Sequence, residues 1–165
     1  MFVAILIAAG MVVGCVYLHL GALVLLWWSY PRLVSLGRLF VGVTVLGVFV
    51  VHFLEIALFA AGIVALAGLD AGDTPGGRLD LGHFDALYYS ATFYTTTGGP
   101  PLPTVPLRLL CVVETLTGVI LIAWTASFLF MVMKKHWEEQ VEGKAGRPTH
   151  SSAVRSQASD DSRTR

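Results

Sequence analysis

The sequence contains few charged residues, and their positions are uneven. Of its 165 residues, 13% are charged and 55% are apolar, with a mean hydropathy of +0.71. Residues 1–31 hold no Asp, Glu, Lys or Arg, and residues 39–69 hold only Glu55. Because a bilayer core needs about 20 apolar residues in a helix, each run is long enough to cross it. We therefore predict an integral membrane protein rather than a soluble domain.

Other absences exclude further classes of protein. No Lys or Arg precedes the first apolar run, and the run is too long for a secretory signal, so we expect it to remain as a helix. The only cysteines, Cys15 and Cys111, fall in apolar runs without metal-site spacing, and we expect small apolar fillers there. No span carries the spaced Arg or Lys of a voltage sensor. No motif indicates an enzyme, a bound cofactor or a nucleic-acid partner.

The hydropathy pattern predicts an all-α membrane protein with three spanning helices. They are expected at residues 1–30, 39–69 and 106–134. Residues 138–165 are expected to form a short helical extension and then a disordered cytoplasmic tail. Arg32 and Arg38 lie in the first short loop without any acid, so the positive-inside rule places this loop in the cytoplasm. The N-terminus is then outside and the C-terminus cytoplasmic, and we expect a bacterial-type cell membrane.

Between the second and third spans lies a stretch typical of a re-entrant loop. Asp85 to Tyr94 forms a short amphipathic helical segment, and Thr95 to Pro103 holds three Thr, two Gly and three Pro. Irregular backbone at membrane depth is tolerated only where protein buries it or where it lines a water-filled path. Its carbonyls and Thr hydroxyls can then replace the hydration shell of a cation.

This stretch resembles the pore region of potassium channels of the tetrameric pore-loop class, whose pore helix leads into a filter of the type Thr-Val-Gly-Tyr-Gly-Asp. Ala86 to Ser90 is similar to the pore helix with its paired aromatics. Thr95 and Thr96 match the two Thr that open the filter, Thr97 takes the Val place and Gly98 that of the first Gly.

The resemblance implies a pore module at 39–134, with the pore helix and filter loop at 83–103. It also implies a homotetramer in the lipid bilayer that conducts potassium or other monovalent cations passively, since one loop cannot surround an ion. The ion path would comprise Thr95, Thr96, Thr97, Gly98 and Gly99, with a transient potassium ion at Thr96, Thr97 and Gly98. Gly118 corresponds to the family's gating hinge, and a Gly for helix packing is the alternative.

The outer half of the filter departs from the family pattern. Gly99, Pro100 and Pro101 stand in place of the Tyr, the second Gly and the Asp. A proline ring fixes φ near about −65° and offers no N–H. We therefore expect roughly two or three ordered ion sites at the inner end instead of about four. A weakly selective cation pore and a subunit that needs a related partner subunit both remain open.

Two acids lie inside predicted spans, where acids are costly and usually face protein or water. We expect five residues to support the filter: Tyr88, Tyr89, Thr92, Glu55 and Glu114. Each of the two acids would do so by tying its own spanning helix to the pore helix. Their candidate partners are Thr92, Tyr94, Thr95 and Trp124. Proton sensing by these carboxyl groups is the alternative.

His52 lies three residues before Glu55, hence on the same helix face, and a hydrogen-bonded pair is the favoured interpretation. With His19 and Glu114 the pair also suggests a buried metal or proton-relay cluster. A proton-coupled transporter using these groups is therefore the rival function, and a non-conducting channel-like subunit is a third.

Overall fold

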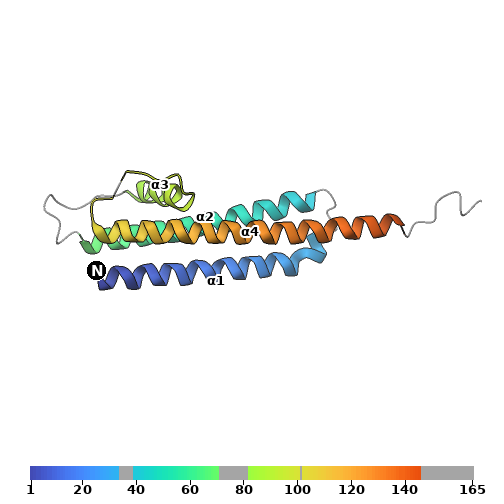
Figure 1. The fold of residues 1–165 in the computed structure, drawn as a ribbon, viewed down its shortest axis with the longest axis horizontal. Helices are drawn as coiled ribbons and strands as arrows, with labels where there is room; N and C mark the ends of the chain where they lie inside the picture. Colours follow the sequence, from blue (N-terminus) through green and yellow to red (C-terminus); the bar gives the residue numbers. More distant parts are fainter. Residues whose placement is uncertain (34–38, 71–81, 101, 146–165) are drawn as a thin grey trace, which may run out of the picture. The chain divides into compact units, whose positions relative to one another are not determined.

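The computed structural model describes residues 1–33, 39–70, 82–100 and 102–145. This part of the chain contains four helices and no strand: α1 (Phe2–Leu33), α2 (Leu39–Asp70), α3 (His83–Tyr94) and α4 (Val105–Ala145) (Figure 1). The chain divides into two compact units, Met1–Leu129 and Phe130–Arg165. The predicted all-α class is confirmed.

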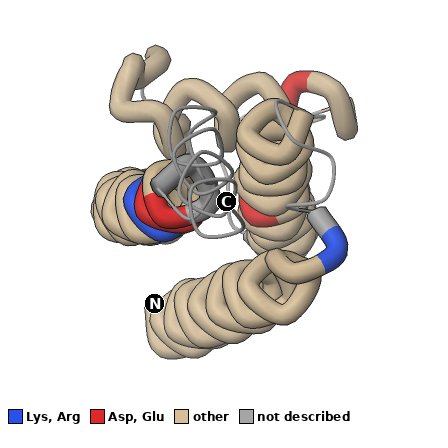
Figure 2. Tube along the Cα trace, turned by 90° about the vertical axis from the view of Figure 1, so that its right-hand side faces the viewer, with Lys and Arg blue, Asp and Glu red and all other residues tan. Residues whose placement is uncertain are grey.

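Three of the helices are long and apolar enough to cross a membrane. Their spans are Phe2–Arg32, Leu39–Leu69 and Val105–Glu142. A helix of 31 residues is about 46 Å long, more than the roughly 30 Å of a hydrocarbon core. Figure 2 shows that α1 is free of charge along nearly its whole length. The protein is therefore an integral membrane protein.

The short helix α3 lies beside α2 (Figure 1). It begins two residues before Asp85, whose carboxylate in the first turn suits the positive helix end. Its buried residues are Ala86, Ser90 and Tyr94, spaced four apart and hence on one face. This face, with one hydroxyl and one phenol, brings polar groups of α3 against its neighbours.

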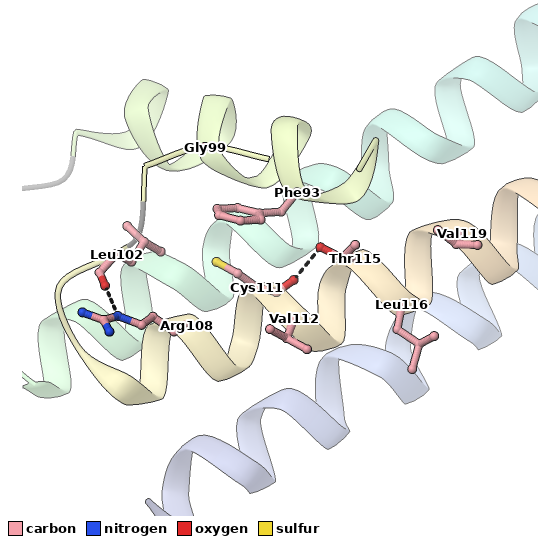
Figure 3. A pocket seen from close by; sticks show the side chains of 9 residues that line it. All are labelled: Phe93, Gly99, Leu102, Arg108, Cys111, Val112, Thr115, Leu116 and Val119. Carbon is pink, nitrogen blue, oxygen red and sulfur yellow. Dashed lines mark hydrogen bonds between the residues drawn. The ribbon is translucent and has the colours of Figure 1, made fainter. Parts of the chain in front are cut away.

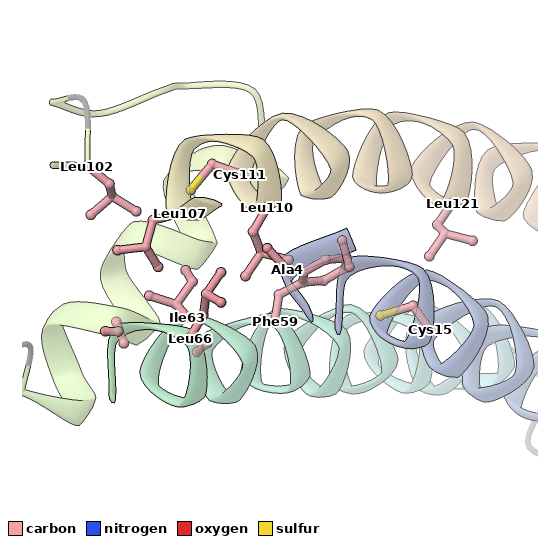
Figure 4. Close-up of a cluster of buried hydrophobic side chains, with 14 residues drawn as sticks. Ala4, Cys15, Phe59, Ile63, Leu66, Leu102, Leu107, Leu110, Cys111 and Leu121 are labelled. Carbon is pink, nitrogen blue, oxygen red and sulfur yellow. The ribbon is translucent and has the colours of Figure 1, made fainter. Parts of the chain in front are cut away.

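The core of the first unit is formed by apolar side chains from all four helices and by Leu102 of the loop after α3 (Figure 4). Phe59 and Ile63 of α2 are fully buried there, next to Leu110 of α4. Gly62 allows close approach, because a Cβ at this position would lie 3.2 Å from the Met11 sulfur. Since lipid tails are as apolar as these residues, such helices are held together by packing and hydrogen bonds rather than by exclusion of water.

Two helices extend beyond the predicted limits. The loop predicted to start at Pro31 is still helical there, and α1 ends at Leu33. Pro31 removes one backbone hydrogen bond from the last turn, and the helix ends two residues later. The rest of that loop, with Arg38, lies outside the described residues.

The short helical extension expected at the start of residues 138–165 is present, and α4 continues as far as Ala145. The segment after Met133 is rich in Lys, Glu and Gln, which favour helices. Lys134 Nζ lies 3.8 Å from Glu138 Oε1, and His136 Nε2 lies 2.8 Å from Gln140 Nε2, both one turn apart. Three other parts of the chain lie outside the described residues: residues 71–81 between α2 and α3, Pro101, and residues 146–165.

Candidate functional site

The loop that follows α3 is exposed from Thr95 to Pro100. Its backbone adopts the left-handed conformation twice, at Thr96 (φ 62°) and at Gly98 (φ 73°). The Thr96 amide donates to the Phe93 carbonyl at 3.0 Å, and the Gly98 amide donates to the Thr92 carbonyl at 2.9 Å. The loop thus folds against the C-terminal end of α3, whose dipole carries partial negative charge.

Oxygen atoms are abundant in this loop. Among the described residues, no donor is hydrogen bonded to the carbonyls of Thr95 to Gly99. The Thr95 hydroxyl donates to the Ala91 carbonyl at 2.7 Å and lies 3.2 Å from the Thr97 hydroxyl. Exposed carbonyl and hydroxyl oxygens are the groups that replace water around a permeating cation. The five predicted path residues therefore form one continuous polar segment.

Two of the predicted supporting residues lie next to this loop. A Cβ placed on Gly99 would lie 3.4 Å from the Thr92 hydroxyl oxygen and 3.7 Å from the Tyr89 ring. The Thr92 hydroxyl in turn donates to the Tyr89 carbonyl at 2.8 Å. Tyr88 is exposed, and its ring meets that of Tyr89 edge to face.

Glu55 is fully buried and contacts α3, as expected, through the Tyr94 hydroxyl, which donates to Glu55 Oε2. His52 Nδ1 lies 3.0 Å from the same carboxylate oxygen and 2.8 Å from the Tyr94 hydroxyl. His19 of α1 reaches the other carboxylate oxygen, with Nδ1 2.8 Å from Oε1. Glu55 thus joins α1 and α2 to the end of α3.

Thr125 of α4 completes this buried cluster. Its hydroxyl oxygen lies 3.1 Å from His52 Nε2 and 3.3 Å from His19 Nε2. Sequence reasoning did not select Thr125, and no signal in the sequence distinguishes it from other Thr residues in the spans. We call His19, His52, Glu55, Tyr94 and Thr125 the His–Glu cluster.

Glu114 is also fully buried but belongs to a different contact. The Ser90 hydroxyl is hydrogen bonded to Glu114 Oε1 and to the Ile56 carbonyl at 2.7 Å. Since a hydroxyl has one proton, both bonds form only if the Glu114 carboxyl is protonated and donates to Ser90. Glu114 therefore ties α4 to α3, and the suggested cluster of Glu114 with the histidines is wrong. Trp124, another candidate partner of the acids, packs instead on His19, and the centroids of the two rings lie 5.4 Å apart.

Gly118 lies where α4 approaches the end of α3 closely. A Cβ at this position would overlap the Tyr94 carbonyl oxygen and lie 3.1 Å from the Tyr94 carbonyl carbon. The helix α4 continues through Gly118 without a break. This contact favours the packing alternative and leaves the hinge role as a proposal.

An apolar cleft of about 670 Å³ lies between the loop and α4 (Figure 3). Phe93 and Gly99 form one wall, and Val112 and Leu116 of α4 form the other. At its end the Arg108 Nε donates to the Leu102 carbonyl at 2.6 Å and thereby holds the loop exit against α4.

The comparisons with known proteins agree with this arrangement. The model of a family described as "Ion channel" matches residues 51–135, which include the second part of α2, all of α3 and its loop, and α4 as far as Lys135. No curated protein and no solved structure matches the chain. Because the matched region covers just over half of the 165 residues, the protein belongs to the ion channel family of pore-domain proteins.

Proposed function

We propose that the protein is a channel subunit that conducts monovalent cations passively, with potassium as the expected ion. One observation carries this proposal: Thr95 to Gly99 are exposed, and their carbonyls accept no hydrogen bond from the described residues. They also follow the negative end of a helix, which favours a cation. A potassium ion would be held transiently at Thr96, Thr97 and Gly98.

Four copies around an axis would complete the ion path, because the loop of one chain offers oxygens from one side only. The apolar cleft beside the loop supports this arrangement, since it offers a neighbouring subunit an apolar surface close to Gly99. A related subunit in the same ring is the alternative partner.

The outer half of the loop decides selectivity in this proposal. Gly99 lacks a side chain that could brace the backbone, and Pro100 has no amide proton with which to fix its neighbours. Ordered sites are therefore expected only at the inner end, and discrimination between potassium and sodium should be weak.

The proposed orientation places the N-terminus outside and the C-terminus in the cytoplasm of a bacterial-type cell membrane. It rests on Arg32 in the last turn of α1 and on Lys134 and Lys135 in the later part of α4.

The test is ion flux into liposomes that contain the purified full chain, with a potassium gradient, a sodium gradient and a proton reporter. We expect potassium flux that Thr96→Ala changes several-fold. Thr44→Ala is the matched control, because it makes the same chemical change on α2, where the Thr44 hydroxyl donates to the Phe40 carbonyl at 2.9 Å. Equal flux in wild type and Thr96→Ala would refute the assignment of the filter.

A proton-coupled transporter is the second candidate, and the buried His–Glu cluster is the observation that favours it. The same assay separates the two functions. Proton movement that disappears in Glu55→Gln, without potassium flux, would establish the transporter. A stable tetramer without flux of either ion would indicate a non-conducting subunit.

A further inference from the structure

We propose that His19, His52 and Glu55 form a binding site for a divalent transition-metal ion of the zinc type, between α1 and the pore module. One ring nitrogen of each histidine and a carboxylate oxygen of Glu55 all lie within 4.8 Å of one another. Two imidazoles and one carboxylate are a common ligand set for zinc. The site does not involve the loop from Thr95 to Gly99, so it does not depend on ion conduction.

The spacing of the ligand atoms suits a small ion. His19 Nδ1 lies 2.8 Å from Glu55 Oε1, and His52 Nδ1 lies 3.0 Å from Glu55 Oε2. Ligands at about 2.0–2.1 Å from a tetrahedral zinc ion lie about 3.3 Å from each other. Both imidazole–carboxylate distances are therefore within a few tenths of an ångström of the separation in a zinc site. The Tyr94 hydroxyl, 2.8 Å from His52 Nδ1, lies close to the fourth position.

When Glu55 is ionised and both histidines are neutral, the hydrogen bonds of the cluster cannot all form. Each neutral histidine has one N–H, and both use it toward an ionised Glu55. Both Nε2 atoms are then acceptors, and both face the single hydroxyl of Thr125, at 3.3 Å from His19 and 3.1 Å from His52. That hydroxyl has one proton and can serve only one of the two rings.

A metal ion removes this conflict. When it occupies the Nδ1 side, each ring carries its proton on Nε2, and the Thr125 oxygen accepts from both rings with its two lone pairs. Metal-bound histidines usually donate their other N–H to such an outer partner, which fixes the ring orientation. The Thr125 hydroxyl therefore lies in the position of the outer hydrogen-bond partner that metal-bound histidines usually have.

The site can be reached from one side. A cleft of about 750 Å³ between α2 and α4 is lined by His52, Tyr94 and Thr125 among apolar residues. His52 is the only one of the three proposed ligands with appreciable exposure, 16% of its side chain. An ion would enter from this cleft past His52, and a water or hydroxide ligand in the cleft could complete its coordination.

The test uses the tag-free full chain, treated with chelator in detergent and then titrated with Co²⁺ as an optical probe of tetrahedral coordination. We expect one Co²⁺ per chain, with strong visible absorption that Zn²⁺ abolishes by displacement. His19→Gln and His52→Gln should each weaken binding by at least 100-fold. Thr125→Val should weaken it by about 10–100-fold, because it removes the outer partner.

His83→Gln is the matched control, since His83 is an exposed histidine at the start of α3, outside the cluster. It should bind Co²⁺ like the wild type. Wild type that binds no more Co²⁺ than the double variant His19→Gln, His52→Gln would overturn the proposal and indicate that the cluster holds a proton instead.

If the variants fail to assemble, X-ray absorption at the zinc edge on the wild type decides the question. Imidazole nitrogens at about 2.0–2.1 Å from zinc would support the site, and a spectrum without imidazole scattering would refute it. Because both readouts measure metal rather than ion flux, failure of this proposal and failure of the channel proposal are distinguishable.

Discussion

Replacement of Gly118 by alanine measures how tightly α4 packs on the end of α3. Alanine is the better helix former by about 0.5–1 kcal/mol. The new Cβ, however, would overlap the Tyr94 carbonyl oxygen, and this is backbone that cannot rotate away. Overpacking of this kind costs about 1–3 kcal/mol. We therefore expect a net loss of about 1–2 kcal/mol in the free energy of unfolding.

The control is Gly42→Ala on α2, where an added Cβ meets nothing within 4 Å and only the gain in helix propensity remains. Titration of both variants with sodium dodecyl sulfate, followed by circular dichroism, should give a lower midpoint for Gly118→Ala and an equal or higher one for Gly42→Ala. Equal midpoints for the two variants would refute the packing argument. A changed open probability with unchanged stability would support the hinge instead.

Two further pairs of substitutions can be tested in the same titration. Tyr94→Phe removes a hydrogen bond to Glu55 and should lower the free energy of unfolding by about 1.5–3 kcal/mol if that carboxylate is charged. Tyr88→Phe, on the exposed face, should leave it unchanged. Equal midpoints for the two variants would contradict the predicted role of the Tyr94 hydroxyl. Glu114→Gln should change the free energy of unfolding by less than about 1 kcal/mol, because the amide can donate to Ser90. Ser90→Ala should cost about 1–3 kcal/mol, because it leaves Glu114 without that partner. A larger loss for Glu114→Gln than for Ser90→Ala would refute the inference that the Glu114 carboxyl is protonated.

Much of the fold follows from the sequence because membrane spans are recognised by the absence of charge. The three apolar runs and the polar, Gly- and Pro-rich stretch after Tyr94 are local signals, and they predict both the helices and the position of the loop. The end of α4 was less predictable. No Gly or Pro occurs between Met133 and Gly143, so the helix continues although the apolar run has ended.

The contacts of the site were less predictable than its residues. A helix that is apolar on all sides, as α1 is, does not indicate which face it turns toward its neighbours. His19 and Glu55 are separated by 36 positions, and only the packed structure brings them together. The role of Gly118 was likewise ambiguous, because a hinge and a close helix contact require the same residue.

The junction between α1 and the matched pore region has a consequence for protein engineering. The region of family similarity begins at residue 51, which suggests a module that could be excised and transplanted. Removal of α1 would delete His19 and leave Glu55 Oε1 without its imidazole partner, at a cost of several kcal/mol. We therefore expect a minimal version of the pore domain to need a neutral residue in place of Glu55.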